Sequence, residues 1–324
     1  MNENRGKCGT IYRKEECTMV ILQQMLVLFL VMLIGFLGER KGILDDITSK
    51  KISWIVVNIA NPAMILSSLS GENRIPSQEL VVTAMISIGM FLCLMGLAVV
   101  LPNILKAKRS QYGVYRVMTV FSNIGFMGFP IISALYGKEA LLYVSLFILP
   151  YNILIYTYGI LCLSSEEINL KSSLKKMGNI GVFASLGALV LYFGNIVLPD
   201  LLSQAFDMFA NLTAPLSMMV IGASFGTMSL RQMLTDVRLL IFAGIKLILI
   251  PVVGMWILVQ FVGNSMLLGV CLVMLATPVG SMTAMLAQQY DCDRDLSSRG
   301  VALTTLLSVV TIPAVAQICK LFLK

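Results

Sequence analysis

Residues 121–137 combine amide, glycine and proline residues in a stretch apolar enough to lie in a lipid bilayer. The residues that interrupt a regular helix there are Asn123, Gly125, Gly128 and Pro130. Proline removes a backbone donor, and glycine releases the helix from its usual restraint. A helix broken inside a membrane exposes half-helix ends whose N-terminal amides attract anions. We predict that these residues bind an anionic group of a substrate; the structural alternative is a kinked helix packed through its small residues.

A second interrupted stretch, residues 275–291, contains Thr277, Pro278, Gly280 and Ser281. When the sequence is aligned with itself at an offset of about 154 residues, Asn123 aligns with Thr277. Interrupted segments at matching places in two halves indicate a transporter's binding site. We expect the hydroxyls of Thr277 and Ser281 to lie one helical turn apart on the same face of a helix, where both can donate to a carboxylate. Thr277, Pro278 and Ser281 therefore join the predicted substrate site.

Polar amides and prolines recur elsewhere in apolar stretches. The candidate supporting residues are Asn58, Asn61, Pro62, Asn152, Asn211 and Pro215. An Asn-x-x-x-Pro pattern at Asn58 and Pro62 repeats at Asn211 and Pro215, with nearly the same offset as the two interrupted stretches. Buried amides also join helices to one another, so a structural and a functional role both stay open.

Two charged residues in apolar stretches are candidates for coupling to a proton or a sodium ion, because charges inside a membrane are usually functional. Asp207 is expected near the outer end of its helix. Lys246 is expected about two turns from a cytoplasmic end, from where a lysine can extend its amine to the interface. The alternative for Lys246 is a counter-charge for an anion.

The composition indicates an all-α polytopic membrane protein. Of 324 residues, 57% are hydrophobic and 13% are charged, and the mean hydropathy is +0.87. The net charge of +7 is accounted for by basic loops that orient membrane proteins, so no nucleic-acid partner is implied. There is no histidine, and the seven cysteines have no metal-ligand spacing. We expect no metal, no cofactor and no enzymatic activity.

About ten membrane-spanning helices fit the chain at roughly 20 residues each. The expected spans are 19–38, 48–70, 79–101, 111–136, 140–163, 178–198, 201–226, 238–262, 265–289 and 297–322. A polar connector, 164–177, divides them into two five-helix repeats, 19–163 and 178–324. Five spans per half is an odd number, so a duplicated half must insert upside down.

Basic residues concentrate in the loops after the odd-numbered spans, which predicts a protein of the cytoplasmic membrane with both termini outside. The polar tail, residues 1–18, is mixed in charge, and its four basic residues conflict with this orientation. One explanation is that translation starts at Met19, and another is that the loops outweigh a short tail.

Several motifs in order resemble the auxin efflux carrier family, in its bacterial branch of malate/malonate-type permeases. They are Asn-Ile-Ala-Asn-Pro-Ala-Met-Ile-Leu (58–66), Ser-Asn-Ile-Gly-Phe-Met-Gly-Phe-Pro (122–130), Ala-Pro-Leu-Ser-Met-Met-Val-Ile-Gly (214–222), Lys-Leu-Ile-Leu-Ile-Pro (246–251), Ala-Thr-Pro (276–278), Ala-Gln-Gln-Tyr (287–290) and Thr-Leu-Leu-Ser-Val-Val-Thr-Ile-Pro (305–313).

The resemblance implies two inverted repeats whose broken helices 4 and 9 cross near the membrane centre, at Asn123, Pro130 and Pro278. It also implies a scaffold of helices 1, 2, 6 and 7, a moving bundle of helices 3–5 and 8–10, a homodimer, and organic anions as substrates. The connector is short where plant members often carry a long regulatory loop, so regulation by phosphorylation is not expected.

The residues and the resemblance together predict a carrier for a small carboxylate such as malate, malonate or lactate, working by alternating access. One alternative is a sodium-coupled symporter for a larger amphipathic anion of the bile-acid type. Another is a membrane sensor or channel that binds a ligand without carrying it.

Overall fold

A computed structural model describes residues 14–67, 77–163, 180–194, 196, 198–226, 235–290 and 292–319. Within these ranges the regular structure is helical, without a named strand and with one isolated β-bridge. The predicted all-α class is confirmed. The connector 164–177 and most of the tail 1–18 lie outside the described residues, although the first helix already begins at Lys14.

The described helices of the first half are α1 (Lys14–Arg40), α2 (Asp46–Ile55), η1 (Val56–Ala60), α3 (Asn61–Ser67), α4 (Ser77–Ile104), η3 (Arg109–Gln111), α5 (Tyr112–Val120), η4 (Ile124–Gly128), α6 (Phe129–Tyr136), α7 (Ala140–Leu154), η5 (Ile155–Gly159) and α8 (Ile160–Leu163). Those of the second half are α10 (Ile180–Phe193), α11 (Asp200–Gly226), α13 (Val237–Gly244), η6 (Ile245–Leu249), α14 (Ile250–Leu258), α15 (Ser265–Ala276), α16 (Ser281–Gln289) and α17 (Arg294–Cys319).

Five of the described helices are long and apolar enough to cross a membrane by themselves: 78–104, 140–163, 200–226, 237–258 and 294–319. Shorter apolar helices cover 124–136, 180–193 and 265–276. These lengths agree with a polytopic membrane protein, while the count of ten spans and the inverted repeat stay predictions.

Short π turns stand directly before three of the prolines. The residues before Pro62, Pro130 and Pro251 donate their N–H groups to carbonyls five residues back, those of Val56, Ile124 and Ile245. Proline has no N–H, and its ring clashes with the carbonyl four residues back in an α-helix. A π turn widens the helix at that point, so the helix continues through each proline.

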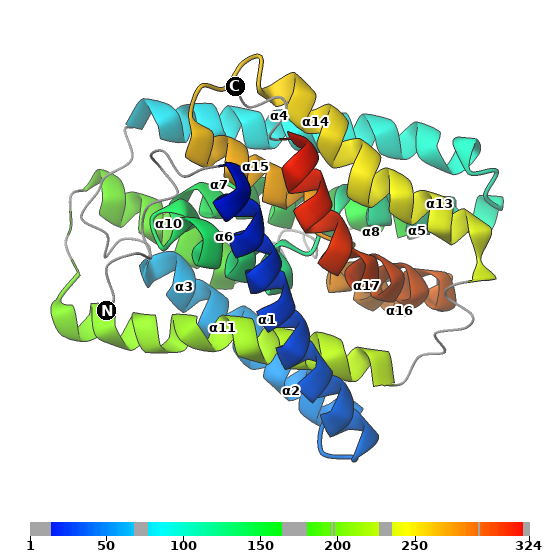
Figure 1. The fold of residues 1–324 in the computed structure, drawn as a ribbon, viewed down its shortest axis with the longest axis horizontal. Helices are drawn as coiled ribbons and strands as arrows, with labels where there is room; N and C mark the ends of the chain where they lie inside the picture. The colour runs from blue at the N-terminus through cyan, green and yellow to red at the C-terminus, as the bar shows by residue number, and fades with distance from the viewer. Residues whose placement is uncertain are drawn as a thin grey trace.

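The helices α1, α2, α3, α10 and α11 contact one another and form what we call the scaffold group. In it, α1 crosses α11 at close range (Figure 1). Glycine permits this approach, because a Cβ atom at Gly35 would overlap the backbone of Met219, and one at Gly222 would overlap the backbone of Met32. The scaffold group therefore has a tight joint that does not depend on large side chains.

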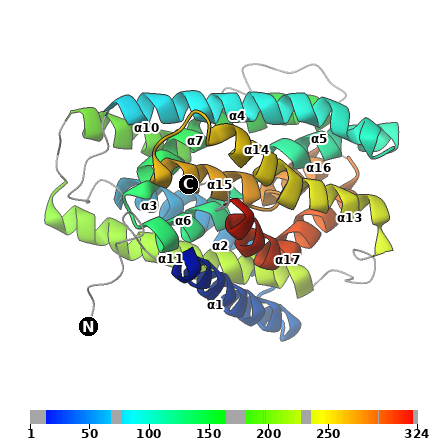
Figure 2. The ribbon, with the colours of Figure 1, turned by 45° about the horizontal axis from the view of Figure 1, so that its top comes forward.

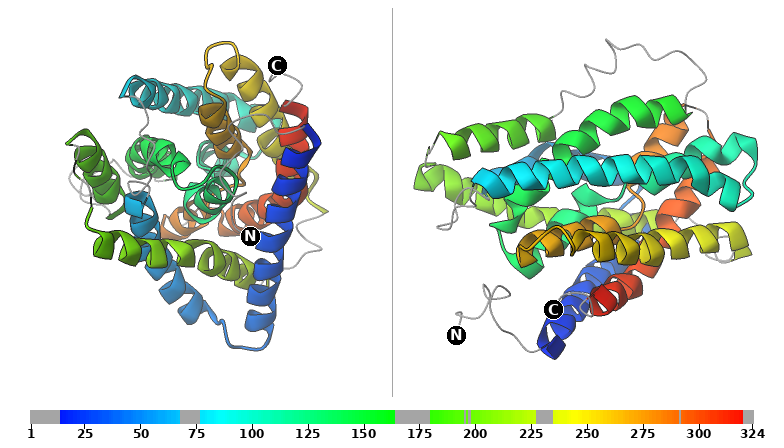
Figure 3. Two further views of the ribbon diagram at one scale, coloured as in Figure 1. Left: turned by 60° about the vertical axis from the view of Figure 1, so that its left-hand side comes forward. Right: turned by 90° about the horizontal axis from the view of Figure 1, so that it is seen from above.

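The remaining helices, α4–α8 and α13–α17, form what we call the break group, because both interrupted helices belong to it. Figure 2 shows α4 extended along one side of this group, where it packs on α5 and α7. On the other side α14 packs on α15, and α16 packs on α17. The two groups meet where α1 contacts α17 and α6, where α10 contacts α7, and where α11 contacts η4 and α6 (Figure 3).

Candidate functional site

The first break in the break group is short and extended. Helix α5 ends at Val120, and Phe121 has φ −100° and ψ 98°. The next helical segment, η4, begins after Asn123, whose side-chain Oδ1 accepts a hydrogen bond from the N–H of Phe126 at 3.2 Å. Pro130 lies seven residues beyond Asn123, inside α6 and just after a π turn, so the extended backbone is confined to residues 121–123.

The second break covers residues 277–280. Helix α15 ends at Ala276, and both Thr277 and Gly280 have extended backbone with ψ near 140° (145° and 139°). Helix α16 begins at Ser281. The helix therefore does not continue from Thr277 to Ser281, and the expectation that their hydroxyls share one helical face is wrong. The Thr277 hydroxyl instead donates to the carbonyl of Met274 at 3.1 Å, within its own helix.

The two breaks pair with each other through an antiparallel bridge between Ser122 and Val279. The N–H of Asn123 donates to the carbonyl of Pro278 at 2.7 Å, and the N–H of Gly280 donates to the carbonyl of Phe121 at 2.9 Å. Unpaired backbone groups are costly inside a membrane, and each break supplies the partners that the other lacks. We call residues 121–123 and 277–280 the paired breaks.

Helix α17 supports the second break from the side. The N–H of Val279 donates to the hydroxyl oxygen of Thr304 at 3.1 Å, and that hydroxyl donates to the carbonyl of Gly300 at 2.7 Å. Both Val279 and Thr304 are fully buried. The N–H group of Val279, which points away from the bridge, therefore has an acceptor on α17.

Lys246, in the π turn η6, reaches the paired breaks with its amine. Its side chain is 0% exposed, and Nζ donates to the carbonyl of Thr119 at 2.9 Å and to the hydroxyl of Ser122 at 2.8 Å. The interpretation that Lys246 extends to the membrane interface is wrong, because its amine points inward to the end of α5. Its other predicted role, as a counter-charge for an anion, stays a prediction.

Asn123 caps the start of η4, and Asn61 reaches η4 from the scaffold group. Both are buried, and the Nδ2 atom of Asn123 and the Oδ1 atom of Asn61 have no hydrogen-bond partner among the residues that the structure describes. Gly125 lies between the scaffold group and the break group here, since a Cβ atom on it would be 3.2 Å from Nδ2 of Asn61. Unsatisfied buried amide groups call for a ligand or water, so these two amides are where a ligand could bind, and the predicted substrate site stays a prediction.

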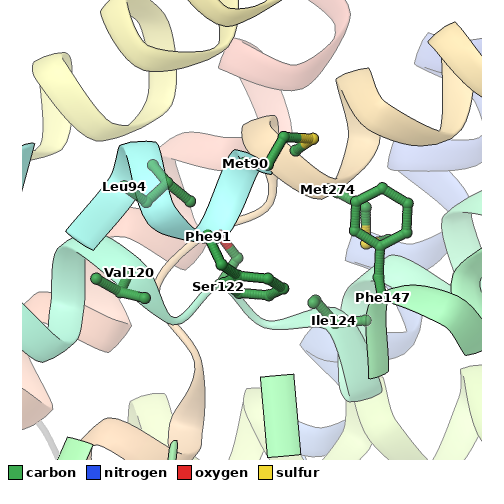
Figure 4. Close-up of a pocket in the computed structure, with 8 residues that line it drawn as sticks. All are labelled: Met90, Phe91, Leu94, Val120, Ser122, Ile124, Phe147 and Met274. Atoms are coloured by element: carbon green, nitrogen blue, oxygen red, sulfur yellow. The ribbon is translucent and has the colours of Figure 1, made fainter. Parts of the chain in front are cut away.

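A small pocket lies beside the first break, between α4, α7 and α15. Its lining is Met90, Phe91, Leu94, Val120, Ser122, Ile124, Phe147 and Met274 (Figure 4). Its volume of about 10 Å³ is room for about one water molecule. Ser122 provides the only hydroxyl among these residues, so the same side chain faces the pocket and holds the Lys246 amine.

The other predicted residues lie in several places. Gly128 is buried against Met274, whose methyl would be 3.0 Å from an added Cβ atom. The amides of Asn58 and Asn152 donate to carbonyls of their own helices, at Trp54 and Ile148. Asn211 and Pro215 are exposed on α11, whereas Thr213 and Ser217 are buried on its inner face. The repeated Asn-x-x-x-Pro pattern therefore does not bring its two copies into equivalent surroundings.

Asp207 forms an ion pair with Lys138, with 2.6 Å between Nζ and Oδ2. Lys138 follows α6 in the break group, and Asp207 lies on α11 in the scaffold group. The two side chains are 45% and 30% exposed. This ion pair links the break group to the scaffold group. That structural role differs from the ion coupling predicted for Asp207, which stays a prediction.

Three polar side chains that were not predicted from the sequence meet in the break group. Oε2 of Glu79 accepts hydrogen bonds from the Tyr143 hydroxyl at 2.6 Å and the Asn264 amide at 2.7 Å. Asn264 also caps α15, accepting from the N–H groups of Met266 and Leu267. The sequence signal was Asn264 directly before an apolar helix, the usual position of a capping residue.

Comparison with known proteins assigns the family. The family described as membrane transport protein matches residues 20–182 and 166–316, which together cover most of the chain. The chain belongs to this family. It includes the auxin efflux carriers, so the predicted resemblance is confirmed at the level of the family.

Two archaeal relatives match this chain over nearly its whole length. An uncharacterized transporter of Methanocaldococcus jannaschii is 24% identical over 307 residues, covering 91% of this chain and 97% of the relative. An uncharacterized transporter of Methanothermobacter thermautotrophicus is 22% identical over 300 residues, covering 90% and 96%. The protein is a membrane transporter, as its sequence predicted.

Proposed function

We propose that this membrane transporter carries a small organic carboxylate, such as malate, malonate or lactate, by alternating access about the paired breaks. The observation that carries the proposal is the bridge between Ser122 and Val279 in the buried centre of the break group. Broken helices at the middle of a transporter are where substrates bind. The positive end of each half-helix and the Lys246 amine favour an anion there.

The carboxylate would bind between the scaffold group and η4. The Asn123 amide can donate through Nδ2, which has no partner in this conformation. Gly125 allows the backbone of η4 to approach the substrate, because it carries no side chain. Asn61 completes the contact from the scaffold side. Thr277 and Ser281 play a smaller part than predicted, since the Thr277 hydroxyl already bonds within its own helix.

Alternating access would come from movement of the break group against the scaffold group. The tight α1–α11 contact keeps the scaffold group together, and the paired breaks move as one unit because two backbone hydrogen bonds join them. The pocket beside Ser122 is too small for a dicarboxylate, so the conformation described here is closed on that side. Opening requires Met90, Phe91 or Phe147 to move.

The proposal is tested by uptake of labelled malate, malonate and lactate into proteoliposomes. Each acid is offered with a pH gradient, with a sodium gradient, and with neither. Saturable uptake of one acid supports a carboxylate carrier, and a dependence on one gradient identifies its coupling. Absence of uptake of all three under every condition would overturn the carboxylate assignment and favour the larger amphipathic anion.

A matched pair of asparagine variants tests the site itself. Asn123→Ala removes the buried amide that faces the substrate, and we expect at least about a tenfold lower uptake, as for a lost hydrogen bond to a charged group. Asn211→Ala changes the same side chain at an exposed position of α11 and should transport normally. Equal uptake by both variants, each correctly folded and inserted, would contradict the proposed site.

A further inference from the structure

The Lys246 amine satisfies oxygen atoms that the first break leaves without a donor. In a continued α5 helix, the N–H of Asn123 would bond to the carbonyl of Thr119. It bonds to the carbonyl of Pro278 instead, and Nζ of Lys246 takes its place at Thr119. The same amine donates to the Ser122 hydroxyl inside the bridge. One positive charge thus holds the negative end of α5.

No carboxylate neutralises this charge among the described residues. Helix η6 packs against α13, α14, α15 and α17, and the two acceptors lie in α5 (Thr119) and in the first break (Ser122). The acidic residue on these helices is Asp295, which is 72% exposed and paired with Arg299 at 2.8 Å. Asp236, before α13, pairs with the same arginine at 3.3 Å. The buried ammonium is therefore held by neutral oxygen atoms, as a bound monovalent cation would be.

We propose that Lys246 is a built-in monovalent cation of the paired breaks, so that the transporter binds no sodium ion at this place. Backbone carbonyls and half-helix C-terminal ends are the groups that coordinate coupling cations in transporters with broken helices. Here a compact ammonium on a flexible tether occupies such a position permanently. This inference rests on the proposed carrier function and adds the source of its central positive charge.

Two substitutions separate the charge of Lys246 from its volume. Lys246→Ala removes both and leaves a void next to the Thr119 carbonyl and the Ser122 hydroxyl. Lys246→Met keeps most of the volume and removes the charge, so a small cation has no room to enter. Both variants and the unchanged protein are purified in detergent and unfolded by heat, without substrate, in equal concentrations of sodium, ammonium, methylammonium or N-methylglucamine chloride.

We expect the Tm of the unchanged protein to be the same in all four salts. The Tm of Lys246→Ala should be lower in N-methylglucamine, whose cation is too large for the void, and should rise saturably with ammonium, methylammonium or sodium. The Tm of Lys246→Met should be lower and should not respond. Uptake should fall about ten- to a hundredfold in both variants, and only Lys246→Ala should recover part of it in the stabilising cation.

The Tm measurement contains no carboxylate, so it stands even if the proposed substrates are not transported. A sodium-specific rise in the Tm of the unchanged protein would overturn the inference, because a sodium site would then coexist with Lys246. So would a Lys246→Ala protein that no cation stabilises, or that is not recovered folded in any of the salts. A Lys246→Met protein with normal Tm and normal uptake would show that the charge is not needed.

Discussion

Gly280 shows how a single residue type can determine the geometry of the paired breaks. Its φ is −70°, which any residue can adopt, so glycine is not required by the backbone conformation. It is favoured by space: a Cβ atom would lie 3.0 Å from the carbonyl oxygen of Ser122 and 3.2 Å from the hydroxyl of Tyr151, which is tighter than ordinary contact. The missing side chain at Gly280 lets the backbones of the two breaks approach each other without crowding.

Gly280→Ala is expected to destabilise the protein by about 1–3 kcal/mol, since crowding a packed interior forces backbone shifts. Gly89→Ala is the matched control, because a Cβ atom there meets open space and alanine in a helix interior is favoured by roughly 0.5–1 kcal/mol. Thermal unfolding in detergent measures both. If Gly280→Ala is as stable as the control, the backbones paired at Ser122 and Val279 can move apart enough to accept the added methyl group.

At the residue scale, the sequence predicted the places of the breaks but not their partners. Asparagine, glycine and proline mark a helix interruption by local chemistry, and both breaks were found. Which backbone atoms pair depends on how two distant segments align. The sequence offset matched Asn123 with Thr277, whereas in the structure Phe121 and Thr277 are the equivalent residues, each directly after the end of its helix, α5 or α15. Lys246 was misplaced because its distance from a helix end does not reveal where its amine points.

At the scale of elements, α17 contributes to the site without being interrupted itself. Its Thr304 hydroxyl accepts the N–H of Val279, which the bridge to Ser122 leaves unpaired. The next residue, Thr305, is also buried, but its hydroxyl donates only to the carbonyl of Val301 in the same helix. Two neighbouring threonines therefore differ in whether they support another element.

Thr304→Val should cost about 1–3 kcal/mol of stability, because it leaves a buried N–H group without an acceptor. Thr305→Val should cost less, because the Val301 carbonyl that it frees already belongs to a helical hydrogen-bond ladder. Thermal unfolding compares the two variants, and Thr304→Val should also lower uptake. If both variants unfold at the same temperature, the contribution of α17 to the second break is smaller than the geometry indicates.

The elements themselves were the most predictable level of the structure. Their apolar length identified α4, α11 and α17 with bounds that differ from the predicted spans by a few residues. The π turns were not predicted, since a proline in a helix is compatible with a kink, a break or a widened turn. The exposed positions of Asn211 and Pro215 were missed because a repeated motif says nothing about which side of a helix faces the interior.

At the scale of the whole molecule, the basic loops predict an orientation that the fold alone does not define. Ser110, in the loop after α4, is expected in the cytoplasm, and Lys138, between α6 and α7, is expected outside. Ser110→Cys and Lys138→Cys, each in a protein without its native cysteines, are treated in intact cells with a membrane-impermeant maleimide. We expect labelling of Lys138→Cys alone, and labelling of Ser110→Cys alone would reverse the orientation.

The pairing of Ser122 with Val279 also has a consequence for how the protein is made. The first break enters the membrane roughly 160 residues before its partner is synthesised, which is about 8–30 s at ~5–20 residues per second. During that time, Phe121 and Asn123 lack the backbone partners that they have in the folded protein. Until the second half is made, the backbone groups of the first break therefore need water or the insertion machinery as hydrogen-bond partners. Rapid translation of the second half would shorten the interval in which the first half is open to misassembly.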